Sequence, residues 1–149
     1  MLRIHKITDS FYVAPQISAE DVDALVDEGF GAVIMNRPDQ ETPDQPPTEE
    51  ISDRADTHNV PFFHIPIQAP PQLSDIDATF AALEATKGKK VLAFCRSGTR
   101  SATLWAYTVV RSGEYTVDGA INAAREAGYD LAPHRPVLED LASLKDGGN

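Results

Sequence analysis

Short apolar runs alternate with helix-forming segments along this chain, and the alternation limits the fold more than any other sequence feature. Apolar runs typical of buried strands occupy residues 11–14, 32–35, 62–67 and 91–94, and residues 4–7 form a further short strand-like segment. Helix signals mark the segments between and after them, at residues 18–28, 48–58, 74–85, 102–111, 116–126 and 137–144. This order predicts a mostly parallel central sheet with helices on both faces. We therefore expect an α/β fold in a single domain that spans residues 1–149.

The overall charge and the cysteine content exclude several functional classes. The chain carries a formal net charge of −10, whereas nucleic acids and anionic membranes are bound by basic surfaces. Its single cysteine cannot form an intrachain disulfide, so folding needs no oxidising compartment. The first residues lack the apolar core of a signal peptide, and no apolar stretch is long enough to span a bilayer. We expect a cytoplasmic protein that binds neither nucleic acid nor membrane.

The single cysteine, Cys95, directly follows the apolar run 91–94 and opens a turn into a helical segment. Backbone N–H groups and the helix dipole at such a junction favour an anion, and the two arginines of the turn favour a thiolate. Most free cysteines are small buried hydrophobes, but electropositive helix N-termini are the surroundings of reactive ones. We predict that Cys95 is a nucleophile.

The other residues of the turn supply groups that a small anionic substrate requires. Arg100 is predicted to hold the anion through its guanidinium. The rest of the predicted anion-binding loop consists of Arg96, Ser97, Gly98, Thr99 and Ser101. Two alternatives stay open: Arg96 could face solvent, and Arg100 could form an ion pair at the start of the helix.

Two more loops follow predicted strands and are expected at the same edge of the sheet. The proline-rich loop 36–47 contains Arg37 and Asp39, and Gln68 follows the run 62–67. Because ligands bind beyond the carboxyl ends of parallel strands, these residues should face Cys95 across one pocket. Arg37 and Asp39 either line this pocket or pair with each other.

The chain resembles a known family in several separate segments. The segments are 11–13, 33–39, 64–67, 95–101, 104–105 and 127–130, of which the cysteine loop and Arg37-Pro38-Asp39 are the most specific. They are similar to the phosphatase-like domain that accompanies beta-lactamase hydrolase-like proteins in bacteria. The resemblance covers about residues 4–144 and implies the fold of dual-specificity protein tyrosine phosphatases.

Two departures from the phosphatase pattern change the predicted reaction. Phosphatases of that fold have five residues between the cysteine and the arginine, whereas this chain has four, as in the short loop of rhodanese-type sulfurtransferases. The position at which such phosphatases place a general acid is occupied here by Gln68 and its neighbours, none of which is acidic. Asp75 and Asp77 lie further on and are interpreted as acids at a helix start.

We therefore expect a sulfurtransferase that passes sulfane sulfur from thiosulfate or a persulfide through a Cys95 persulfide. The alternative is a phosphoester hydrolase of the tyrosine or dual-specificity type, acting through a Cys95 phosphoenzyme. A third possibility is an anion-binding module without turnover. No cofactor or metal is expected, since His5, His58, His64 and His134 lack the spacing of metal ligands and only His64 falls near the predicted pocket.

Overall fold

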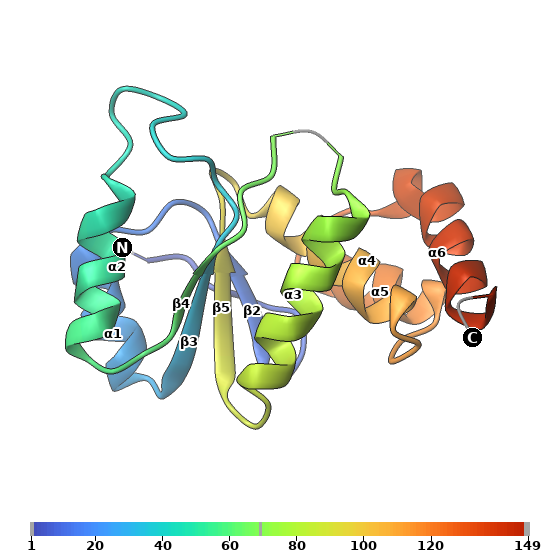
Figure 1. The fold of residues 1–149 in the computed structure, drawn as a ribbon, viewed down its shortest axis with the longest axis horizontal. Coiled ribbons are helices and arrows are strands. Elements are labelled where there is room, and N and C mark those ends of the chain that lie inside the picture. Colours follow the sequence, from blue (N-terminus) through green and yellow to red (C-terminus); the bar gives the residue numbers. More distant parts are fainter. Residues whose placement is uncertain (1, 69, 148–149) are drawn as a thin grey trace.

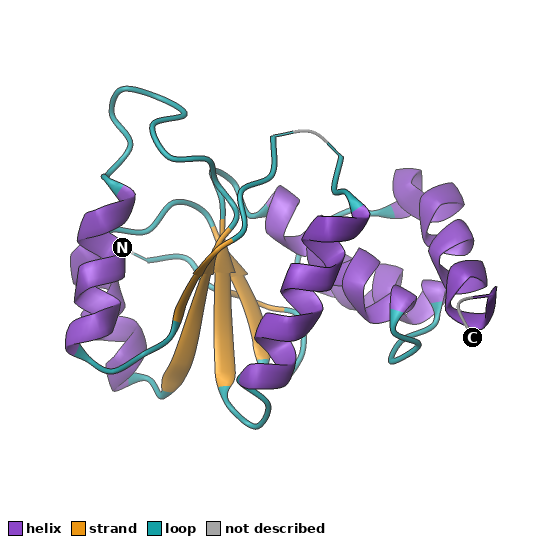
Figure 2. Ribbon diagram, in the orientation of Figure 1, coloured by secondary structure: helices purple, strands orange, loops and turns teal. Residues whose placement is uncertain are grey.

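A five-stranded sheet lies between two groups of helices in the computed structural model, which describes residues 2–68 and 70–147 (Figures 1 and 2). The strands are β1 (His5–Lys6), β2 (Phe11–Ala14), β3 (Phe30–Met35), β4 (Phe62–His64) and β5 (Lys90–Phe94). The helices are α1 (Ala19–Asp27), α2 (Thr48–Thr57), α3 (Leu73–Ala85), α4 (Thr99–Arg111), α5 (Val117–Glu126) and α6 (Arg135–Gly147), with a 3₁₀ turn at Ala132–His134.

The strand order is β1-β2-β5-β3-β4, with β1 antiparallel to β2 and the other neighbours parallel. This arrangement confirms the predicted mostly parallel sheet. Strand β5 is central, because β2 pairs with one of its edges and β3 with the other. The residue that follows β5 is thus surrounded by the loops that follow the neighbouring strands.

Each face of the sheet has its own apolar core. One cluster packs strand residues against α1 and α2 and includes Leu25, Ile51 and Leu92, all without exposed surface. The other packs the opposite face against α3, α4, α5 and α6. Trp105 belongs to this second cluster, where it stacks on Phe11 and meets Tyr115 edge to face.

Several predicted boundaries were wrong for local reasons. Helix α4 begins at Thr99 rather than at residue 102, because Gly98 takes a left-handed conformation and starts the helix early. Helix α3 begins at Leu73, one residue before the predicted start, because Asp75 accepts the backbone N–H of Gln72 and caps the first turn. The apolar run 62–67 is a strand only as far as His64.

Helix α6 begins at Arg135, two residues before the predicted start, and Thr48 is the first residue of α2 instead of its cap. Within the described ranges, no helix combines the length and the apolar character needed to cross a membrane.

Replacing Leu92 with alanine should lower the free energy of unfolding by about 2–5 kcal/mol, because Leu92 is fully buried in the central strand. Urea unfolding followed by circular dichroism would measure the loss. The matched control is Leu73→Ala, since Leu73 is 53% exposed and the same deletion should change the free energy by less than about 0.5 kcal/mol. Equal losses in the two variants would contradict the described core.

Candidate active site

Cys95 occupies the residue after β5, at the edge where the parallel strands end. Its backbone N–H donates to the Ala14 carbonyl at 3.4 Å, while the Phe94 carbonyl accepts the Asn36 N–H at 2.8 Å. The last residue of β2 and the first residue after β3 are therefore held beside Cys95. The side chain has no exposed surface, and its Sγ accepts the backbone N–H of Gly98 at 3.0 Å. A donor directed at the sulfur stabilises negative charge there.

Gly98 determines the shape of the turn, and its position has no room for a side chain. Its φ of +95° lies in the left-handed region, and a Cβ on this backbone would overlap the Tyr129 hydroxyl. That hydroxyl donates to the Ser97 carbonyl at 3.3 Å. Burial raises the pKa of Tyr129, and the nearby Cys95 raises it further. Tyr129 thus keeps its proton and holds the outer side of the loop.

The early start of α4 places Arg100 and Ser101 in the first helical turn. Ser101 is buried, and its Oγ makes no hydrogen bond with any part of the chain that the structure describes. The Ser97 hydroxyl donates to Thr99 Oγ1 at 3.1 Å, at the surface. Arg96 is exposed, in agreement with the alternative that its side chain faces solvent.

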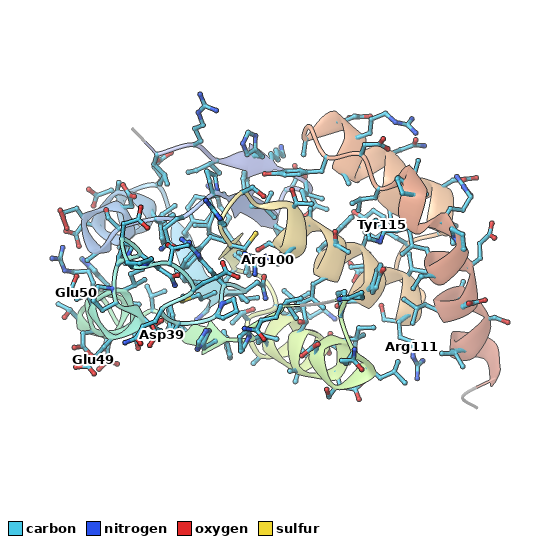
Figure 3. All side chains as sticks on the ribbon, turned by 90° about the horizontal axis from the view of Figure 1, so that it is seen from above. Asp39, Glu49, Glu50, Arg100, Arg111 and Tyr115 are labelled. Carbon is cyan, nitrogen blue, oxygen red and sulfur yellow. The ribbon has the colours of Figure 1, made fainter. Side chains whose placement is uncertain are left out.

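Arg100, which is labelled in Figure 3, links three segments at this edge of the sheet. Its Nη1 donates to Glu41 Oε2 at 2.8 Å and to the Ile67 carbonyl at 2.7 Å, and its Nη2 donates to Glu41 Oε1 at 2.8 Å. The hydrogen bonds to Glu41 raise the pKa of Arg100, and Cys95 also raises it. Neither the Nε–H nor the second Nη2–H donates to an oxygen or nitrogen atom of the described residues, and Cys95 lies near enough to the guanidinium to raise its pKa, so an anion beside Cys95 can reach these donors.

Glu41 is the functional candidate that sequence reasoning missed. Its Oε1 also accepts the Arg37 Nε–H at 3.0 Å, so one carboxylate joins two guanidinium groups. The hydrogen bond from Arg100 is the main reason that the pKa of Glu41 falls to about 2. Nothing distinguishes Glu41 from the other acids of loop 36–47 until the fold brings it to Arg100, 59 residues away.

Arg37 and Asp39 do not pair with each other. Arg37 is buried and donates to Gln16 Oε1 at 3.0 Å and to Thr42 Oγ1 at 2.9 Å, in addition to Glu41. Asp39 accepts the Thr48 hydroxyl at 2.7 Å, which lowers its pKa. Figure 3 shows Asp39 on the side of the molecule where α2 lies. Arg37 therefore supports the site through Glu41, while Asp39 fastens the loop to α2.

Gln68 and Arg100 line one cavity of about 470 Å³, so the segment after β4 and the helix that follows Cys95 meet there. Cys95, Arg37 and Asp39 are not among its lining residues, so a single pocket shared by all the predicted residues stays a prediction. His134 also lines this cavity, whereas His64, the one histidine expected near the predicted pocket, is not among its lining residues. The turn Ala132–His134 reaches this cavity because the helix that follows it, α6, packs against α4. Nothing in the spacing of the sequence indicates that packing. His64 donates its Nε2–H to the Arg37 backbone carbonyl at 2.9 Å.

Two carboxylates considered as general acids for a phosphatase have other partners or positions. Asp75 is engaged with the Gln72 N–H at the start of α3. Asp77 lines a different cavity, together with Phe80 and Arg111 near the far end of α4. With Asp39 held by Thr48, none of the three is directed at the cysteine loop by a described contact.

A family model matches residues 3–111, which includes the sheet, the loop 36–47 and the whole cysteine loop. The model describes the phosphatase-like domain of beta-lactamase hydrolase-like proteins. The chain belongs to this family. The resemblance noted from the separate sequence segments is therefore confirmed.

Curated relatives agree with this assignment. The beta-lactamase hydrolase-like protein of Agrobacterium fabrum is 28% identical over 135 residues, which are 90% of this chain and 31% of that protein. The protein of the same description from Xylella fastidiosa strain 9a5c is 28% identical over 142 residues, 95% of this chain and 33% of that protein. The chain thus spans about a third of the length of these relatives.

Solved structures place the fold among phosphatases. A structure from Neisseria meningitidis described as a candidate phosphatase is 33% identical, with a TM-score of 0.77 over 93% of this chain and 97% of its own. PTPMT1 in complex with PI(5)P is similar in fold alone, with 18% identity and a TM-score of 0.77 over 97% of each chain. The expected dual-specificity-phosphatase-like fold is confirmed. These comparisons favour the phosphatase alternative over sulfur transfer, to which none of them points.

Replacing Gly98 with alanine should lower the free energy of unfolding by about 2–4 kcal/mol. About 1–2 kcal/mol comes from the left-handed backbone, and the rest comes from overlap with Tyr129. Urea unfolding would compare this variant with Gly88→Ala, whose φ is +89° but whose added Cβ meets nothing within 4 Å. Adding Tyr129→Phe should recover part of the loss at Gly98 only. Equal losses at the two glycines would contradict the described packing.

Glu41 should contribute stability that depends on pH. Because the pKa of Glu41 falls from 4.5 to about 2 on folding, the contribution is present above pH 4.5 and is lost as the pH falls towards 2. Glu41→Gln should cost on the order of 1 kcal/mol at neutral pH, after allowance for solvent screening, and almost nothing near pH 2. Urea unfolding at several pH values would measure it. The exposed Glu126→Gln is the control, and a cost at Glu41 that stays constant with pH would refute the linkage.

Proposed function

We propose that this domain is a cysteine-dependent phosphoester hydrolase. The observation that carries the proposal is the pair of donors near Cys95, namely the Gly98 N–H at 3.0 Å from its Sγ and the Arg100 guanidinium, whose pKa Cys95 raises. Membership of a phosphatase-like family and the phosphatase fold of the solved relatives support the same reaction. The PI(5)P complex of PTPMT1 shows that a protein of this fold binds a phosphoester, in agreement with a small anionic substrate here.

The reaction proceeds in two displacements at phosphorus. The Cys95 thiolate attacks the phosphorus atom, the bond from phosphorus to the ester oxygen breaks, and the alcohol or phenol oxygen leaves with the bonding electrons. Water then attacks the thiophosphate, the sulfur–phosphorus bond breaks, and inorganic phosphate leaves while the thiolate is restored. Arg100 and the loop N–H groups bind the non-bridging oxygens, and the Ser101 hydroxyl, which lacks a partner among the described residues, is free to donate to them or to the sulfur.

Protonation of the leaving group determines which esters react well. Asp39, Asp75 and Asp77 are all directed elsewhere, so the leaving oxygen takes its proton from solvent. A missing general acid typically costs 10²–10⁴-fold, and the cost is smallest when the leaving oxygen is stable as an anion. The enzyme should therefore prefer aryl phosphates to alkyl phosphates.

Sulfur transfer remains the second candidate, and one observation favours it. Four residues separate Cys95 from Arg100, and sulfur transfer requires no acid because its leaving group departs as an anion. The thiolate would attack the outer sulfur of thiosulfate, and the sulfur–sulfur bond would break to release sulfite and leave a Cys95 persulfide. An acceptor thiolate would then take the outer sulfur and restore the cysteine thiolate.

Hydrolysis of 4-nitrophenyl phosphate should depend on Cys95 and on the guanidinium of Arg100. We expect Cys95→Ser to lower kcat by at least about 10³-fold and Arg100→Lys by about 10²-fold, since an ammonium group cannot reproduce the planar fork. Arg125→Lys is the matched control, because Arg125 is exposed on α5 and bonds only to Asn122 among the described residues. Phosphate release measured in steady state, with urea unfolding to verify each fold, would test these values.

A parallel experiment separates the three candidate functions. The protein is incubated with thiosulfate or glutathione persulfide, and its intact mass is measured. A one-sulfur adduct that requires Cys95, without phosphate release from aryl phosphates, would replace hydrolysis by sulfur transfer. Binding of inorganic phosphate without either activity would identify an anion-binding module.

A further inference from the structure

The cavity that begins at Arg100 extends along α4 and has a mostly apolar wall. Its apolar lining comes from the β4–α3 segment, from α4 and from the first turn of α6: Ile67, Pro70, Pro71, Tyr107 and Val137. Its volume of about 470 Å³ lies in the range of pockets that hold small organic ligands. Thr99, Thr103 and Tyr107 follow one another at intervals of four residues on α4, so the groove runs about 12 Å along the helix axis.

The charges around this groove are unusual for so acidic a chain. None of its described lining residues is a carboxylate, and Arg100 stands at one end. Three other cavities of the described structure each contain at least one acid: Glu84 in one, Asp77 in another and Glu20 in a third. The Glu41 carboxylate that pairs with Arg100 lies outside this lining. On a chain with a net charge of −10, a groove lined by a cation and by no described carboxylate favours a ligand that is itself an anion.

The far end of the groove carries a polar pair. The Tyr107 hydroxyl and His134 Nδ1 are hydrogen-bonded at 2.8 Å, and their rings meet edge to face with centroids 5.7 Å apart. This hydrogen bond holds both side chains in place in the lining of the groove. A ligand that spans the groove therefore meets a cation first, then an apolar stretch, and finally these two aromatic rings.

We propose that this groove binds the aryl body of the substrate, so that the substrate class is aryl phosphoesters with an extended, flat apolar group. The inference deepens the proposed hydrolysis, since it rests on the phosphoryl group lying at Arg100 and Cys95. The phosphoryl group binds the Arg100 end, and the rings lie between α4 and the first turn of α6. Burial of apolar surface against the groove supplies affinity that the small anion site lacks.

Binding of unreactive phosphonates tests the groove without any turnover. Calorimetric titration of the wild-type protein with phenylphosphonate and with 4-biphenylphosphonate should show at least about tenfold tighter binding of the second, because its outer ring reaches the far half of the groove. Equal affinities, or no binding of either compound, would overturn the proposal.

A charge placed in the groove should remove this preference. Val137 is 43% exposed at the start of α6 and lines the groove, so Val137→Glu should abolish the tenfold difference. Leu144→Glu is the control, because Leu144 is 45% exposed on the same helix and lies outside the groove, and this variant should keep the full difference. The same loss in both variants would refute a specific role for the groove.

Activity distinguishes failure of the groove from failure of the proposed reaction. With 4-biphenyl phosphate and phenyl phosphate as substrates, kcat/KM should show the same preference and the same loss in Val137→Glu. Phosphonate selectivity without hydrolysis would leave the groove in place and reject the hydrolase. Hydrolysis of both esters at equal kcat/KM would support the hydrolase and reject the groove.

Discussion

The guanidinium of Arg100 holds the candidate site together. It binds Glu41 from the loop after β3 and the Ile67 carbonyl from the segment after β4, and it stands on the helix that follows β5. These partners are far apart in the chain, but β3, β4 and β5 are parallel and end at the same edge of the sheet. One planar group with several donors is well suited to such a junction, because it can satisfy a carboxylate and a carbonyl and keep further N–H groups for an anion.

The same ion pair has two opposite consequences for an anionic substrate. Glu41 orients Arg100, which reduces the entropy that the side chain loses when a substrate binds. Its charge also offsets part of the positive potential that would attract the substrate. Arg37 compensates part of the negative charge of Glu41, since its buried guanidinium donates to the same carboxylate. Among the described residues that line the adjoining groove there is no carboxylate, and the proposed aryl body would gain affinity there from apolar burial, which does not depend on charge.

Local sequence rules predicted most of the elements and the cysteine loop. The alternation of apolar runs with helix signals led to the parallel sheet, and the spacing of Cys95, Gly98 and Arg100 led to the strand–turn–helix junction. The start of α4 was misplaced because glycine can adopt several backbone conformations, and the sequence does not show that Gly98 adopts the left-handed one. The predicted strand 62–67 was too long, because an apolar run does not show where hydrogen bonding with β3 ends.

Long-range contacts account for what sequence reasoning could not see. Glu41 is one of several acids in its loop, and His134 stands apart from every motif, until packing brings them to Arg100 and to the groove. By itself the sequence determined the order of strands and helices, the thiol at a helix start and the arginine beside it, because these depend on residues that are neighbours in the chain. The tertiary structure alone decided which carboxylate meets the arginine and which apolar side chains enclose the groove. These contacts depend on how α4, α6 and the loops pack, and neither the periodicity nor the spacing of residues in the sequence predicts that packing.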